Sequence, residues 1–200
     1  MKKLALLLCL LLAARPAASA QAVPTGMEKA VFAGGCFWCM QPPFDHATGV
    51  VSTVVGYAGG TEANPNYAQV SSGETSHREA IEVTFDPTQT SYAKLLDVFW
   101  RNINPVQRDG QFHDFGEQYT SAIFFHAEGQ RAAAEASKAA LARSGKFQKP
   151  IATVLLPAGT FWPAEESHQK YYLKNRMAYR MYYFASGRAS FQRRFWSAGE

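Results

Sequence analysis

The 200-residue sequence contains very few cysteines: Cys9, Cys36 and Cys39 are the three present. Small secreted proteins that depend on disulfides carry many more, which excludes a disulfide-stapled scaffold. Cys9 lies in an apolar N-terminal segment that we expect to be removed. The two cysteines that remain are three positions apart, and thiols this close suggest redox chemistry.

The chain also lacks an apolar run long enough to cross a membrane. Residues 4–14 are apolar, but Arg15 and Pro16 end the run before the roughly 20 residues that a transmembrane helix needs. Two lysines precede the run, and small residues at positions 18–20 follow it. This pattern predicts a cleaved signal peptide over residues 1–20. We therefore expect a periplasmic or otherwise exported protein without stable membrane insertion.

Net charge is low as well. The formal charge is +4, and three basic residues but no acidic ones lie in the predicted signal peptide, so the remainder carries about +1. This balance predicts no nucleic-acid partner. The remaining roughly 180 residues can bury one sizeable core. We expect a short tether over residues 21–28, a single domain over residues 29–200, and a monomer.

Hydrophobic periodicity and turn residues predict alternating strands and helices. We expect strands over residues 29–33, 49–57, 79–85, 118–125 and 151–156, and helices over residues 37–46, 92–102 and 127–144. Residues 58–73 and 104–117 have the composition of loops. The order βαββαβ of the first six elements favours an α+β fold with a ferredoxin-like core, both helices on one face of the sheet. An extra helix over residues 127–144 and a strand over residues 151–156 would follow, and the chain after that strand would form a coil-rich tail.

The segment Gly34-Gly35-Cys36-Phe37-Trp38-Cys39 lies where a predicted strand gives way to a helix. The free N–H groups and the dipole at a helix N-terminus lower the pKa of a thiol, so we expect Cys36 to be held partly as thiolate. Cys39 lies one helical turn further on. It could condense with a sulfenic acid formed on Cys36 before that acid is oxidised further.

This spacing alone leaves three kinds of site open: a redox-active dithiol, half of a zinc site and a structural disulfide. Zinc is the weakest alternative, because no further cysteine would remain and the five histidines lack ligand spacing. A structural disulfide across so short a loop would remove little chain entropy. We therefore predict no metal.

The motif Gly35-Cys36-Phe37-Trp38 resembles the hallmark of the peptide methionine sulfoxide reductases of A type. Residues 54–60, 64–67, 72–80 and 116–123 resemble further segments of that family, in the same order. The resemblance covers most of the predicted mature chain and implies a catalytic reductase domain. It implies reduction of methionine sulfoxide, free or in oxidised proteins and peptides, with preference for the S epimer at sulfur. No cofactor is implied, and a thioredoxin-fold protein would be the electron donor.

The resemblance also implies the roles of five residues. Cys36 would be the nucleophile and Cys39 the resolving thiol. Glu79 would be the general acid that protonates the sulfoxide oxygen, and Tyr67 and Tyr119 would donate hydrogen bonds to the same oxygen.

Three further residues would contact the substrate. Phe37 and Trp38 resemble the apolar wall that receives the terminal methyl group of methionine, and Asp114 resembles a polar residue that shapes the site. A carboxyl held among these rings would have a raised pKa, as Glu79 needs in order to donate a proton near neutrality.

Two positions depart from the commoner family pattern: Cys39 where many relatives carry glycine, and Gln41 where many carry glutamate. No cysteine follows position 39, so Cys39 is the candidate resolving thiol. Two other functions stay open on the sequence. A thiol-disulfide oxidoreductase would work without Glu79, and a non-catalytic redox-sensing module would turn over no sulfoxide.

Overall fold

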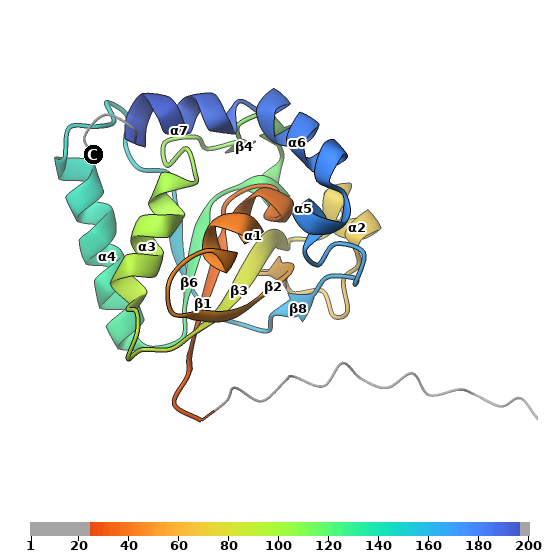
Figure 1. Cartoon of the computed structure of the whole chain (residues 1–200). Coiled ribbons are helices and arrows are strands. Elements are labelled where there is room, and N and C mark those ends of the chain that lie inside the picture. Colours follow the sequence, from red (N-terminus) through yellow and green to blue (C-terminus); the bar gives the residue numbers. More distant parts are fainter. Residues whose placement is uncertain (1–24, 197–200) are drawn as a thin grey trace, which may run out of the picture.

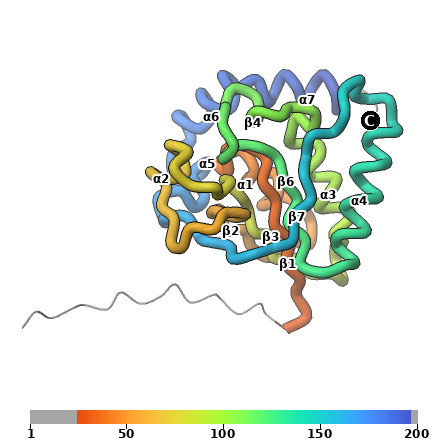
Figure 2. Tube along the Cα trace, turned by 180° about the vertical axis from the view of Figure 1, so that it is seen from behind, coloured from red at the N-terminus to blue at the C-terminus, as the bar shows by residue number. Residues whose placement is uncertain are grey.

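A computed structural model describes residues 25–196 of the chain (Figures 1 and 2). The predicted signal peptide and the first half of the predicted tether lie outside the described residues. A six-stranded sheet with the strand order β7-β6-β1-β3-β2-β8 forms the centre. Its strands are β1 (Glu28–Ala33), β2 (Val50–Ala58), β3 (Arg78–Phe85), β6 (Ala122–Phe125), β7 (Val154–Pro157) and β8 (Trp162–Pro163).

Within the four inner strands, β6, β1, β3 and β2, each pair of neighbours is antiparallel. β8 extends the sheet antiparallel to β2, and β7 extends it parallel to β6. A separate two-stranded ribbon pairs β4 (Gly110–Gln111) with β5 (Asp114–Phe115). The predicted mixture of helices and strands is confirmed.

Helices cover one face of the sheet (Figure 1): α1 (Phe37–Asp45), α3 (Tyr92–Arg101) and α4 (Glu128–Arg143). Because side chains alternate along a strand, Phe32 of β1 and Ile81 of β3 share this face and pack with Phe44 of α1 and Phe99 of α3. The opposite face, viewed in Figure 2, packs against residues 156–161, including Phe161.

Within residues 25–196, no helix combines the length and the apolar character that crossing a membrane requires.

The structure corrects four details of the sequence prediction. The tail is helical rather than coil-rich, the loop over residues 58–73 contains a helix, and the loop over residues 104–117 contains the β4–β5 ribbon. The last strand of the core begins at Ala122 instead of position 118, because residues 117–119 form a 3₁₀ turn. The additional helices are α2 (Tyr67–Ser71), η1 (Glu117–Tyr119), α5 (Tyr171–Lys174), α6 (Arg176–Ala185) and α7 (Arg188–Trp196).

Candidate active site

The two cysteines lie at the start of α1. Cys36 is the N-cap residue of the helix, and Gly35 before it has φ +80°, in the left-handed region that favours glycine. A Cβ atom at Gly35 would lie 2.5 Å from the Cβ atom of Gln111, so the turn also requires glycine for space. Both cysteines carry free thiols, and both are buried: Cys36 is 5% exposed and Cys39 is 1% exposed.

The structure contradicts the expectation that Cys36 rests partly as thiolate. Burial, reinforced by the hydrogen bond with Cys39, raises the pKa of Cys36 well above its ordinary value. The same hydrogen bond lowers the pKa of Cys39 in spite of burial. Burial therefore opposes ionisation of Cys36 at the start of α1.

Glu79 lies directly against this turn. It comes from β3, is 1% exposed, and its Oε2 accepts the Phe37 N–H at 2.9 Å. Burial, and next the charge of Cys36, raise the pKa of Glu79 well above 4.5. The structure thus supplies the burial that proton donation near neutrality requires.

Tyr67 and Tyr119 reach the same place from two short helical turns. Burial, followed by the charge of Glu79, raises the pKa of Tyr67 to about 12 and that of Tyr119 further still. Cys36 adds to both shifts, so both phenols lie within electrostatic reach of the carboxyl and the thiol. Both are neutral hydrogen-bond donors at physiological pH.

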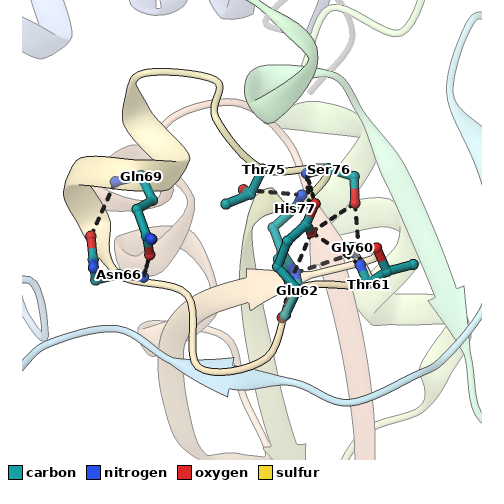
Figure 3. A network of polar contacts seen from close by, with 8 residues as sticks. All are labelled: Gly60, Thr61, Glu62, Asn66, Gln69, Thr75, Ser76 and His77. Carbon is teal, nitrogen blue, oxygen red and sulfur yellow. Dashed lines mark hydrogen bonds and ion pairs between the residues drawn. The ribbon is translucent and has the colours of Figure 1, made fainter.

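The loop that carries Tyr67 is held by a network of polar contacts (Figure 3). Asn66 caps α2 by accepting the Gln69 N–H at 3.1 Å, and the Gln69 side chain accepts the Asn66 N–H in return. His77 is 1% exposed: its Nδ1 accepts the Gly60 N–H at 3.2 Å, and its Nε2 contacts the Glu62 carbonyl at 2.8 Å. His77 therefore holds the connection between β2 and β3.

Phe37 and Trp38 form an aromatic wall beside the thiols. The Trp38 ring stacks on Tyr171 at 3.9 Å between centroids, and its Nε1 donates to Nδ1 of His168 at 3.2 Å. The His168 ring lies 4.2 Å from that of Tyr67. Sequence reasoning gave His168 and the aromatic tail no role, although the density of aromatic residues from position 168 onward was a usable signal.

Asp114, on β5, meets the tail at a second point. Its Oδ2 accepts the Tyr182 hydroxyl at 2.5 Å. That hydroxyl is also within hydrogen-bond reach of the Cys36 sulfur, an interaction that lowers the pKa of Cys36 by less than burial raises it. Burial raises the pKa of Asp114 as well. Tyr182 is a residue of the site that the sequence did not reveal.

Polar contacts also join α5 and the residue before it to α1. The Lys170 ammonium pairs with Asp45, and Asp45 also accepts the Tyr172 hydroxyl at 2.7 Å. The buried Gln41 accepts the Lys170 N–H at 2.8 Å and donates to Thr53 at 3.1 Å. At the position where many relatives carry glutamate, Gln41 thus anchors the tail.

Within the described part of the chain, no cluster of three or more His, Cys, Asp or Glu side chains has the arrangement of a metal site.

Residues 28–200 match the protein family described as Peptide methionine sulfoxide reductase. The chain belongs to the peptide methionine sulfoxide reductase A family. It is 53% identical over 170 residues to the peptide methionine sulfoxide reductase MsrA of Halalkalibacterium halodurans, which covers 85% of this chain and 97% of that protein. The predicted family membership is confirmed.

Two solved structures of Saccharomyces cerevisiae Mxr1 resemble this member of the reductase family. The reduced form has a TM-score of 0.71 and 31% sequence identity, over 76% of this chain and 88% of the yeast chain. The complex of Mxr1 with Trx2 has a TM-score of 0.53 and 23% identity, over 77% and 91% of the two chains, and that likeness shows the fold alone.

For a peptide methionine sulfoxide reductase, the structure brings all eight predicted site residues around the start of α1. The thiol of Cys36, the buried carboxyl of Glu79 with its raised pKa and the two neutral phenols converge there. This arrangement can attack a sulfur atom and protonate the oxygen bound to it.

Proposed function

We propose that this protein reduces the S epimer of methionine sulfoxide, free or within oxidised proteins, and so repairs them. One observation carries the proposal: Phe37, which follows Cys36 directly, donates its N–H to the buried Glu79 carboxyl at 2.9 Å. Nucleophile and acid are thus fixed to one turn of the chain, as sulfoxide reduction requires.

The first half of the reaction uses the hydrogen bond between the cysteines. As the Cys36 sulfur attacks the sulfoxide sulfur, its proton passes to the thiolate form of Cys39, which becomes a thiol, and Glu79 gives its proton to the sulfoxide oxygen. Tyr67 and Tyr119 donate hydrogen bonds to that oxygen as negative charge develops on it. Methionine then leaves as the thioether, and the oxygen remains on Cys36 as sulfenic acid.

In the second half, Cys39 condenses with the sulfenic acid to form a Cys36–Cys39 disulfide and water. A thioredoxin-fold protein then reduces the disulfide, and no bound cofactor takes part. The structure of yeast Mxr1 together with Trx2 supports a donor of this kind.

The substrate methyl group would lie on the aromatic wall. Phe37 is fully buried, whereas Trp38 is partly exposed, so the wall has a rigid base and an accessible edge. Tyr171, stacked on Trp38, limits the movement of that edge. Asp114 orients Tyr182 beside the Cys36 sulfur.

We also propose that the protein is exported, that it is a monomer and that its core is ferredoxin-like. The basic, apolar and small-residue pattern of residues 1–20 supports export by a cleaved signal peptide. The eight site residues of one chain surround the start of α1 without a second copy, and we propose a monomer. The antiparallel order β6-β1-β3-β2 supports a ferredoxin-like core within a single domain.

The deciding experiment measures turnover of the two separated epimers of a methionine sulfoxide peptide. Wild type, Cys36→Ser and Cys39→Ser are compared with dithiothreitol and with thioredoxin as reductant. We expect reduction of the S epimer alone, no activity for Cys36→Ser, and activity of Cys39→Ser with dithiothreitol but not with thioredoxin. If neither epimer is consumed while the protein exchanges disulfides, a thiol-disulfide oxidoreductase takes the place of this function.

A further inference from the structure

Arg188 is the largest of the fully buried side chains in the described structure. It is 1% exposed and is the first residue of α7. Gly187 before it has φ +83°, and the Ser186 hydroxyl accepts the Arg188 N–H at 3.4 Å. The tail therefore turns sharply at this point and sends a guanidinium group into the protein.

The guanidinium group lies against the turn that carries Cys36. Its Nη2 donates to the Gly34 carbonyl at 3.0 Å and lies 3.2 Å from the position of a Cβ atom at Gly35. Its Nη1 donates to the Asn102 carbonyl at the end of α3 and contacts Sδ of Met40 at 3.6 Å. Arg188 thus joins the beginning of α1 to the end of α3.

In the described part of the chain no carboxylate is in contact with Arg188, although Asp114 lies within electrostatic reach of it. None of the ion pairs within residues 25–196 includes Arg188, and its Nε has no hydrogen-bond partner. The ring of Phe112 lies 4.5 Å from its Cζ and supplies only a weak compensation. Burying a charge without a counter-charge in contact is costly, so a nearby anion would be strongly favoured.

The sulfur of Cys39 is a suitable anion. Cys39 precedes Met40, whose sulfur touches the guanidinium group, and its pKa is lowered first by the hydrogen bond from Cys36 and then, against burial, by the charge of Arg188. Oxidation of Cys36 to sulfenic acid removes the thiol that donates this hydrogen bond. The positive charge of Arg188 remains in place for the second half of the reaction.

We propose that Arg188 is a positioning residue for disulfide formation: its guanidinium group holds the Gly34–Cys36 turn and provides the counter-charge for the Cys39 thiolate that attacks oxidised Cys36. This inference rests on the proposed function. In the step, the Cys39 sulfur forms the S–S bond while the Cys36 S–O bond breaks. The bonding electrons leave with the oxygen, which takes up the proton that Cys39 has released, by way of Glu79, and departs as water.

The test separates the two halves of the reaction in a single turnover with the S epimer. Wild type is compared with Arg188→Gln, Arg188→Lys and the matched control Arg193→Met, which changes an exposed arginine of the same helix. Released methionine reports the first half, and trapping by dimedone reports sulfenic acid that has not yet been resolved. The rate of disulfide formation is followed from pH 6 to pH 9.

We expect Arg188→Gln to release one equivalent of methionine but to form the disulfide about tenfold more slowly near neutrality, because one pKa unit changes the thiolate fraction about tenfold. Its pH profile should shift to higher pH, and Arg188→Lys should restore the profile. The groups that face Cys39, all of which contribute to the profile, are Cys36, Glu79, Asp114, Tyr179, Tyr182, Tyr183 and Arg188.

Folded Arg188→Gln with the wild-type rate and pH profile of disulfide formation would overturn the inference. If Arg188→Gln does not fold, the pKa of Cys39 is measured by alkylation in Cys36→Ser, whose serine hydroxyl preserves the hydrogen bond to Cys39. A Cys39 pKa at or above the ordinary thiol value of about 8.5 would also overturn the inference. Failure of the wild type to release methionine would instead contradict the proposed function.

Discussion

Glu79 shows how one buried residue connects catalysis with stability. Its carboxyl is enclosed between β3 and the start of α1, and a single backbone N–H of Phe37 is its hydrogen-bond donor in the described structure. One donor does not compensate for the burial of a negative charge, so the pKa of the carboxyl is raised. The same burial that raises the pKa of Glu79, and so suits it to donate a proton, makes its ionised form costly for the fold.

The first prediction concerns the rate of the first half-reaction. Glu79→Gln retains an oxygen that accepts the Phe37 N–H but has no proton to give. We expect methionine release to slow by about 10² or more, with substrate binding retained. In the wild type the rate should be constant at low pH and fall as pH rises through the raised pKa. Single-turnover rates across pH measure both, with Glu82→Gln on the same strand as control. Equal rates for Glu79→Gln and wild type at every pH would exclude Glu79 as the acid.

The second prediction concerns stability. The pKa of Glu79 is raised in the folded state, so between about pH 4.5 and that raised value the folded chain holds a proton that the unfolded chain has lost. The free energy of unfolding then falls with rising pH, by up to about 1.4 kcal/mol per pH unit. Glu79→Gln lacks this dependence, so its stability relative to wild type should rise between pH 4.5 and pH 7.5. Urea unfolding of the reduced proteins tests this, and a difference that is constant with pH would contradict it.

Residues of the site were predictable where a family motif marked them. Cys36, Glu79, Tyr67 and Tyr119 occur within ordered motifs, and the structure places them together. Tyr182 and Arg188 could not be found in this way: a tyrosine or an arginine in an aromatic tail has no local signature, and its role depends on where distant packing brings it. The raised pKa of Cys36 was missed for a related reason, because the sequence shows a helix start but not its burial.

At the scale of elements, α2 positions Tyr67 with only five residues. So short a helix has little stability of its own, and the reciprocal bonds between Asn66 and Gln69 supply much of it (Figure 3). The orientation of the Tyr67 phenol therefore depends on a cap that never touches the substrate.

The third prediction is that Asn66→Ala lowers kcat several-fold, because loss of an N-cap costs about 1 kcal/mol and α2 has few other bonds to hold Tyr67 in place. The reactivity of the thiols toward dithiobisnitrobenzoate should not change. Asn66→Asp keeps the oxygen that accepts the Gln69 N–H and should retain most of the activity. If Asn66→Ala and Asn66→Asp have the same kcat, the cap does not govern Tyr67.

The long elements were predictable and the tail was not. Strands β1, β2 and β3 and helices α3 and α4 follow clear periodicities, and their observed bounds lie within one residue of the predicted ones. Helix α6 exposes Met177, Met181 and Phe184 beside Arg176 and Arg180, so its outer face mixes apolar and charged residues, while Tyr182 is turned to the site. Only the contacts of α6 with α1 and β5 decide which of its sides faces the protein.

For the whole molecule, the remaining question is whether the helical tail folds together with the sheet. Helix α7 reaches across to the end of α4, where Phe147 stacks near Phe195 at 5.0 Å and Lys146 lies 4.3 Å from the ring of Trp196. Arg188 fastens the other end of α7 to α1 and α3. With anchors at both ends, the tail has no free hinge, and we expect it to unfold with the core.

The fourth prediction follows from these anchors. Phe147→Ala should lower the free energy of unfolding by about 1 to 3 kcal/mol, because Phe147 is partly buried and packs on three rings of α7. Phe184→Ala, at a site 60% exposed, should change it by less than about 0.5 kcal/mol. If the chain is one cooperative unit, far-ultraviolet and near-ultraviolet circular dichroism will report coincident transitions in both variants. An early near-ultraviolet transition in Phe147→Ala would show that the tail separates from the sheet. Methionine sulfoxide reduction should then be lost at the same denaturant concentration, because Tyr182 and Arg188 would leave the site with the tail.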